Sequence, residues 1–173
     1  IARHYMDFYG AVVDSARIVV TTGSSGAFLL SFLSAFDQGD RVGLAIPGYP
    51  AYKNILAALD IEVVEIQVDG STRFQPTAAI LDRLDVPLDG LIVASPSNPT
   101  GSMLGAAEFQ LLADWCRRKS VRLISDEIYH GLTYGQTPVT ALQLDADAII
   151  INSFSKYFSM TGWRLGWMIL PED

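Results

Sequence analysis

Length, composition and charge restrict the kinds of protein that this chain can represent. Its 173 residues are 50% hydrophobic, which is enough to bury one full α/β core. The net charge of -7 argues against a nucleic-acid-binding surface, which needs clustered Lys and Arg. No apolar run approaches the ~18 residues of a membrane span, and a single cysteine excludes an internal disulfide.

Short apolar runs alternate with helical stretches along the whole chain. The runs predict seven strands, near residues 17–21, 41–46, 61–67, 90–95, 121–125, 147–152 and 164–170. Helices are expected from Ala27 and over Ala106–Lys119, where Cys116 is a packing residue. Without repeats, low-complexity segments or a linker, this pattern predicts one α/β domain.

The first polar segment, Thr21–Gly26, lies between a strand and the apolar helix that begins at Ala27. Small residues at a helix start leave backbone N–H groups free, and with serine hydroxyls and the helix dipole they make a seat for a phosphate. Ser and Gly are also favoured helix caps when no ligand binds. Alone, this segment is weak evidence.

Two further polar segments follow strands. In Pro47–Tyr52, Tyr49 stands between a glycine and a proline and could lay its ring on an aromatic cofactor, or it could simply cover the core. In Ala94–Gly101, prolines flank Asn98, whose amide can donate to an anionic oxygen. As a plain turn the second segment is ordinary, and its weight comes from its place after a strand.

Asp126 closes the apolar run 121–124. It is either a helix cap or a negative charge directed at a ligand. An anion in this position could keep an aromatic ring nitrogen protonated. Tyr129, three residues further, could reach an oxygen of the same ring, although a half-buried tyrosine with a satisfied hydroxyl is the commoner case.

Lys156 is the most informative residue, because hydroxyls precede it and an arginine follows it. It lies in Ser153–Lys156, just past the strand expected at 147–152, and Arg164 comes eight positions later. Open α/β sheets bind their ligands at this end of the strands. A lysine that can lose its proton beside a phosphate site can hold an aldehyde as a Schiff base. The alternative is an exposed loop lysine.

Together these motifs resemble the class I and II aminotransferases, which are fold type I pyridoxal phosphate enzymes related to aspartate aminotransferase. The matching order is Gly-Ser-Ser, Pro-Gly-Tyr-Pro, Ser-Asn-Pro-Thr-Gly, Asp-Glu-Ile-Tyr, Ser-Phe-Ser-Lys and Gly-Trp-Arg-Leu-Gly, over positions 23 to 166. The resemblance implies a three-layer α/β large domain with a mostly parallel seven-stranded sheet. One strand is antiparallel, and Arg164–Leu170 is expected to be that strand because the link from Lys156 is too short for a parallel crossover.

The resemblance also implies a role for each motif residue. Lys156 is similar to the Schiff-base lysine, Asp126 to the partner of the pyridine nitrogen, and Asn98 and Tyr129 to the partners of the ring oxygen. Tyr49 is expected to stack on the ring. The phosphate ligands are expected among Gly23, Ser24, Ser25, Ser153, Ser155 and Arg164, with Ser153 preferred by spacing, Ser155 secondary, and the choice between Ser24 and Ser25 open.

The function implied is transfer of an amino group from an amino acid to a 2-oxo acid by way of Lys156, with pyridoxal 5'-phosphate as cofactor. A cytoplasmic homodimer without nucleic-acid or membrane partners is expected. Residues 1–173 would be an incomplete cofactor-binding large domain, without the N-terminal segment, the small C-terminal domain and the arginine that binds the substrate carboxylate. His4 and His130 are expected to be surface or structural residues.

Two rival functions share this set of residues. A carbon–sulfur β-lyase also removes the Cα proton, and it is distinguished by its products, pyruvate and ammonia. A non-catalytic aminotransferase-like sensor domain of a transcription regulator also keeps the lysine, and a basic winged-helix segment upstream would reveal it.

Overall fold

The computed structural model describes residues 1–172. All seven predicted strands are present, and their ends differ from the predicted ones by at most two residues. They are β1 (Ile18–Thr21), β2 (Arg41–Ile46), β3 (Glu62–Gln67), β4 (Gly90–Ala94), β5 (Arg122–Asp126), β6 (Ile149–Ser153) and β7 (Gly166–Ile169).

The strands form one sheet in the order β1-β7-β6-β5-β4-β2-β3. The pairs β2–β3, β2–β4, β4–β5 and β5–β6 are parallel, whereas β7 runs antiparallel to both of its neighbours. The prediction of one antiparallel strand within Arg164–Leu170 is therefore confirmed. Because β7 is reversed between β1 and β6, all six other strands point the same way. Their carboxyl ends meet at one edge, where ligands bind in open α/β sheets.

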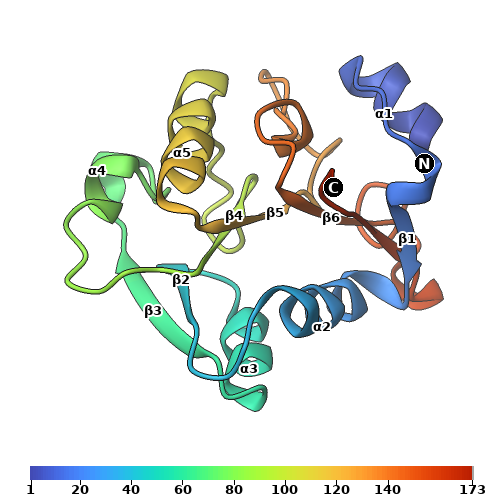
Figure 1. Cartoon of the computed structure of the whole chain (residues 1–173). Helices are drawn as coiled ribbons and strands as arrows, with labels where there is room; N and C mark the ends of the chain where they lie inside the picture. Colours follow the sequence, from blue (N-terminus) through green and yellow to red (C-terminus); the bar gives the residue numbers. More distant parts are fainter. Residues whose placement is uncertain (173) are drawn as a thin grey trace.

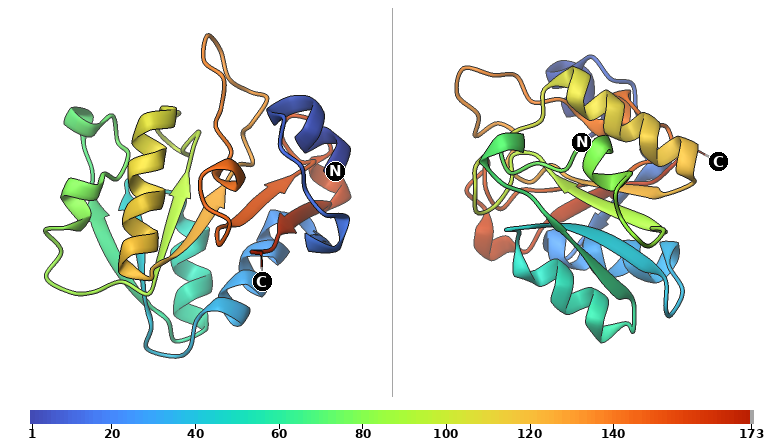
Figure 2. Two further views of the ribbon diagram at one scale, coloured as in Figure 1. Left: turned by 45° about the horizontal axis from the view of Figure 1, so that its top comes forward. Right: turned by 90° about the vertical axis from the view of Figure 1, so that its left-hand side faces the viewer.

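Helices cover both faces of the sheet and make three layers (Figures 1 and 2). On one face lie α2 (Gly23–Ala35) and α3 (Pro50–Ala58), and on the other α1 (Ala2–Tyr9), α4 (Ala78–Leu81) and α5 (Ala106–Lys119). The bounds predicted for α5 are confirmed, and Cys116 is buried within it. Single-turn 3₁₀ helices are η1 (Ser15–Arg17), η2 (Gly70–Thr72), η3 (Ala141–Gln143) and η4 (Thr161–Trp163).

The core has two parts because the central strands are buried on both faces. Successive side chains of a strand point to opposite faces. Ile92, Ile124 and Ile151 accordingly pack under α2 and α3, while Leu123 and Ile150 pack under α1 and α5. This double burial explains why these strands are nearly continuous apolar runs in the sequence. No helix within residues 1–172 is long and apolar enough to cross a membrane.

Candidate active site

The motif segments converge on one cavity at the carboxyl edge of the sheet. Each follows a different strand, and the parallel arrangement brings their ends together. Nine of the eleven predicted site residues line this cavity: Ser24, Ser25, Tyr49, Asn98, Asp126, Tyr129, Ser155, Lys156 and Arg164. The other two, Gly23 and Ser153, are buried and are not among the residues that line it.

Gly23–Gly26 form the first turn of α2, whereas the sequence predicted a loop here and a helix from Ala27. The expected start is therefore wrong by one turn, because two serines between glycines were taken for loop residues. Thr22, at the N-cap, makes no side-chain capping bond. The first N–H groups of α2 are thus left for an anion, which the helix dipole favours.

Two glycines let this turn approach its neighbours closely. A Cβ at Gly23 would overlap the guanidinium of Arg164, and a Cβ at Gly166 would lie 2.7 Å from the backbone nitrogen of Ser24. Gly23 also has a left-handed φ of 72°, which glycine adopts without steric cost. Because neither glycine has a side chain, the start of α2 can lie against β7 and next to the guanidinium of Arg164.

Arg164 is held in place by the turn before β7. It follows η4 with a left-handed φ of 51°, and its Nη1 donates to the carbonyl oxygen of Thr161 at 3.2 Å. The guanidinium and the N-terminus of α2 therefore present positive charge to the same end of the cavity. This combination suits a phosphate group.

The turn that carries Lys156 is fixed by serine and threonine hydroxyls. The Ser153 hydroxyl accepts from the backbone nitrogen of Ser155 at 3.1 Å, and the Thr161 hydroxyl donates to the Ser155 carbonyl at 2.7 Å. Ser155 rather than Ser153 lies on the cavity wall, and Ser153 is buried within the turn. The Lys156 Nζ lies 6.0 Å from the centre of the Tyr129 ring.

Asp126 is buried at the last position of β5, and its carboxylate has defined partners. It accepts from the Tyr52 hydroxyl and from the backbone nitrogen of Ile128, the latter at 3.1 Å. A turn rather than a helix follows, so the alternative of a helix cap is wrong. Burial raises the pKa of Asp126 to about 6, although both hydrogen bonds lower it. A cation in the cavity would favour the charged carboxylate and counteract the effect of burial.

Tyr52 is a site residue that the sequence analysis missed. Tyr49 is the N-cap of α3, and Tyr52 lies one helical turn later. The two rings meet edge to face with centres 5.4 Å apart. Residues three apart in a helix share a face, so the spacing was a usable signal once Tyr49 had been chosen. The Tyr52 hydroxyl donates to the Asp126 carboxylate, and the Tyr52 ring lines the cavity wall together with Phe28.

Asn98 and Tyr129 approach each other from neighbouring loops. The pKa of Tyr129 is raised, chiefly by burial and then by the charges of Asp126 and Tyr49, while a hydrogen bond from Asn98 opposes the shift. Asn98 belongs to the loop after β4, and Tyr129 to the turn after β5. Both can direct a donor at one acceptor atom in the cavity.

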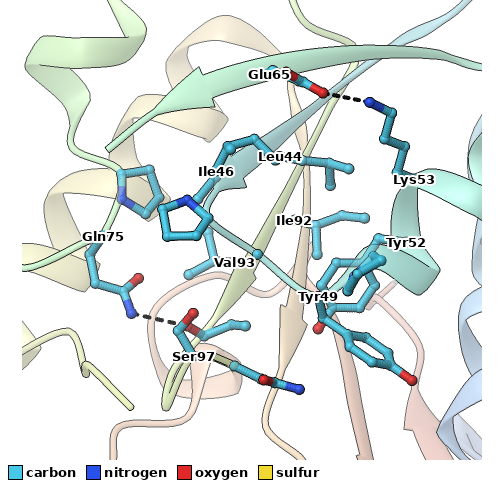
Figure 3. A pocket seen from close by; sticks show the side chains of 17 residues that line it. Leu44, Ile46, Tyr49, Tyr52, Lys53, Glu65, Gln75, Ile92, Val93 and Ser97 are labelled. Carbon is cyan, nitrogen blue, oxygen red and sulfur yellow. Dashed lines mark hydrogen bonds and ion pairs between the residues drawn. The ribbon is translucent and has the colours of Figure 1, made fainter. Parts of the chain in front are cut away.

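A second cavity of about 280 Å³ adjoins the first (Figure 3). Apolar side chains such as Leu44 and Ile92 form much of its wall. At its rim Lys53 pairs with Glu65 at 2.6 Å, and the buried Gln75 amide donates to the Ala94 carbonyl at 3.1 Å. The two cavities share three wall residues: Tyr49, Tyr52 and Asn98.

Comparisons with known proteins agree with this geometry. The family described as aminotransferase class I and II matches residues 1–173. A valine–pyruvate aminotransferase of Mycobacterium tuberculosis is 55% identical over 173 residues, which cover 99% of this chain and 45% of that protein. An aspartate aminotransferase of Streptomyces avermitilis is 30% identical over 170 residues, 95% of this chain and 42% of that protein.

A solved structure gives the same result. The crystal structure of an aminotransferase from Mycobacterium tuberculosis matches with a TM-score of 0.95 at 55% identity, over 98% of this chain and 44% of that one. The fold and the sequence together define an α/β domain of the aminotransferase type. The chain belongs to the class I and II aminotransferase family, and it spans less than half the length of these relatives.

Proposed function

We propose that this domain binds pyridoxal 5'-phosphate and that the full-length protein transfers an amino group from an amino acid to a 2-oxo acid. One observation carries the proposal: Lys156 shares a cavity with a buried carboxylate, Asp126, and with a positively charged anion seat at Arg164. When bound, the cofactor supplies an aldehyde for the amino group and a ring that withdraws electrons from the substrate Cα.

The residues of the anion seat fit a phosphate ester. The first turn of α2 offers N–H groups and the hydroxyls of Ser24 and Ser25, and Arg164 adds a guanidinium that can bind two oxygens at once. Gly23 and Gly166 leave the space that this close arrangement needs. In our proposal Ser155 contributes from the wall, while Ser153 shapes the turn that presents Lys156.

Asp126 is proposed to face the pyridine nitrogen. Its carboxylate is oriented by Tyr52 and by the Ile128 N–H, and it lies deep in the cavity where water does not screen its charge. Asn98 and Tyr129 would donate to the ring oxygen, and Tyr49 would stack on the ring face. These contacts hold the ring in one orientation relative to Lys156.

Lys156 is proposed to bind the cofactor first and then to act as the base. As a neutral amine, Nζ of Lys156 would take the proton from the substrate Cα and return it to another carbon. The short turn fixed by Ser153 and Thr161 holds Lys156 on the wall of the cavity. Precise placement matters because orientation accounts for much of the rate of such proton transfers.

Valine as donor and pyruvate as acceptor are the substrates we propose to test first. The support is the 55% identity to a protein named valine–pyruvate aminotransferase. The cation that binds the substrate carboxylate is proposed to come from sequence outside these residues, in a small C-terminal domain. We further propose that the protein is a homodimer in the cytoplasm. The dimer is supported by three exposed aromatic side chains beside the Lys156 turn, Tyr157, Phe158 and Trp163, which a second subunit would cover.

The proposal is tested by replacing Lys156 in the full-length protein. Lys156→Ala should abolish the visible absorbance of lysine-bound cofactor while the circular dichroism spectrum stays unchanged. Borohydride treatment of wild type should fix the cofactor to the peptide that contains Lys156, as read by mass spectrometry. Lys119→Ala, at the exposed end of α5, is the matched control and should keep both signals.

Product analysis separates the transferase from a lyase. With valine and pyruvate, the transferase should yield alanine and the oxo acid of valine without release of ammonia. Visible absorbance that persists in Lys156→Ala would contradict the assignment of the lysine. Pyruvate and ammonia released from a cysteine-type substrate, with no transfer, would contradict the proposed reaction.

A further inference from the structure

His130 lies outside the cavity, yet it is bonded at both of its ring nitrogens. Its side chain is buried. Nε2 lies 2.8 Å from the Ser95 carbonyl oxygen, and Nδ1 lies 2.6 Å from the Tyr9 hydroxyl. These two bonds tie the imidazole to segments that are 35 and 121 residues away in the sequence.

The bonding pattern fixes the tautomer. A carbonyl oxygen can only accept, so Nε2 must carry the proton and donate to Ser95. Nδ1 then accepts from the Tyr9 hydroxyl. Burial lowers the pKa of His130 to about 4, which agrees with a neutral ring at neutral pH. The Glu127 Oε2, which faces Nδ1 at 3.5 Å, completes the surroundings of this nitrogen.

The two bonds join three segments around the cavity. Ser95 begins the loop that presents Asn98, and His130 directly follows Tyr129. Tyr9 is the last residue of α1, which lies on the same face of the sheet as α5 (Figure 1). The imidazole therefore spans the two loops whose side chains meet at the cavity, and α1 braces it from outside.

The same turn also contacts the lysine segment. Gly131 has a left-handed φ of 91°, and a Cβ at this position would lie 2.5 Å from the ring of Tyr157. Tyr157 directly follows Lys156. The turn 127–131 is thus packed against the lysine turn on one side and bonded to the Asn98 loop on the other.

We propose that His130 is a positioning residue that sets the distance between Asn98 and Tyr129, so that both side chains can donate to one ring oxygen of the cofactor. The inference rests on the proposed function, because it names what the two side chains hold. The Nε2–H bond to Ser95 is the essential contact, and the Tyr9 hydroxyl keeps the ring in the orientation that makes this bond.

Two amide variants of the full-length protein separate the two nitrogens. The side-chain nitrogen of glutamine can reach the position of Nε2, whereas asparagine is too short to reach Ser95. His130→Gln should therefore retain most of the wild-type behaviour and His130→Asn should lose it. Tyr9→Phe removes the donor to Nδ1 without altering the imidazole. Tyr5→Phe is the matched control, since its hydroxyl lies in the same helix but accepts from the Trp167 Nε1.

Three quantities are measured: the cofactor dissociation constant, the pH midpoint of the visible band of bound cofactor, and hydrogen exchange at residues 95–101 without cofactor. His130→Asn should weaken cofactor binding roughly tenfold, the scale of one lost hydrogen bond. It should raise the midpoint by at least about half a unit, because a ring oxygen without its donors holds a proton more tightly. Exchange at 95–101 should accelerate.

The controls decide between positioning and general stability. The proposal is overturned if His130→Asn lowers the melting temperature but leaves the midpoint and the exchange at 95–101 unchanged, or if Tyr5→Phe shifts them equally. It is also overturned if His130→Gln behaves like His130→Asn. Should wild type bind no cofactor, the proposed function fails, and exchange at 95–101 alone decides whether His130 holds this loop.

Discussion

Asp126 and Glu127 are adjacent buried acids with different surroundings. Asp126 lines the cavity, where Tyr52 and the Ile128 N–H contact it. Glu127 turns away from the cavity and accepts from the Ala141 backbone nitrogen at 2.9 Å and from the Ser125 hydroxyl at 3.2 Å. Burial raises both pKa values, to about 6 for Asp126 and about 8 for Glu127.

Burial and a shifted pKa therefore do not distinguish a ligand-binding acid from a structural one. The distinction lies in what each carboxyl group faces. Glu127 secures the start of η3 to the end of β5, and its Oε2 has no hydrogen-bond partner within residues 1–172. Asp126 faces space that a ligand can enter. Four experiments test this contrast.

The largest effect is expected for Asp126→Asn in the full-length protein. The variant keeps the size of the side chain but removes the charge that supports electron withdrawal by the ring. Turnover with saturating cofactor should fall at least about a hundredfold, while the cofactor dissociation constant changes less. Equal losses in turnover and in cofactor affinity would argue that Asp126 serves only to bind.

Glu127→Ala should act on stability instead. It leaves the Ala141 N–H and the Ser125 hydroxyl without an acceptor, which should lower the free energy of unfolding by about 1–3 kcal/mol. Urea denaturation measures this loss, and turnover per folded molecule should remain near wild type. Glu127→Gln is the control. It should be close to wild type at pH 7, because an acid with a pKa of about 8 is largely protonated there.

The pH dependence of cofactor-free protein should separate the two acids. In unfolded chains carboxyl groups lose their protons near pH 4, but these two keep them in the folded state. Their contribution to stability is thus complete below about pH 4 and is lost as the pH rises, through about 6 for Asp126 and about 8 for Glu127. Asp126→Asn should weaken the decline in melting temperature between about pH 4 and 6, and Glu127→Gln should weaken it there and also abolish it between about pH 6 and 8. A decline identical to wild type in both variants would contradict the assignment.

The smallest effect is expected for Tyr52→Phe. Its hydroxyl lowers the pKa of Asp126, so its loss should raise the pH below which cofactor affinity falls, by roughly half a unit to one unit. Titration of the cofactor dissociation constant against pH measures this limit. Tyr134→Phe, at a side chain that is 91% exposed, should leave the limit where it is in wild type.

The sequence was sufficient to predict the sheet and the edge at which the site lies. Apolar runs marked all seven strands, and the runs are nearly continuous in β4, β5 and β6 because these central strands are buried on both faces. Polar motifs directly after those runs then had to meet at the carboxyl edge. Lys156, Asp126 and Asn98 share one cavity for this reason.

Contacts that depend on how separate elements pack could not be predicted in this way. The bond from Tyr52 to Asp126 needs the orientation of α3 against the sheet, which no local pattern encodes. Gly166 is a plain strand residue in the sequence, and its closeness to Ser24 follows only from the pairing of β7. Likewise, His130 is buried because α1, from the other end of the chain, packs over its turn.

The reversal of β7 has a consequence for biosynthesis. Thr21 pairs with Gly166, so the serines after β1 meet Arg164 only when β7 has been added beside β1. Until β7 has left the ribosome, a nascent chain therefore lacks the complete proposed phosphate seat, and β1 lacks the one strand that pairs with it among residues 1–172. Under the proposed function, free cofactor would assist folding at this site only after β7 has left the ribosome, and pauses in translation before β7 would prolong the period in which β1 is unpaired.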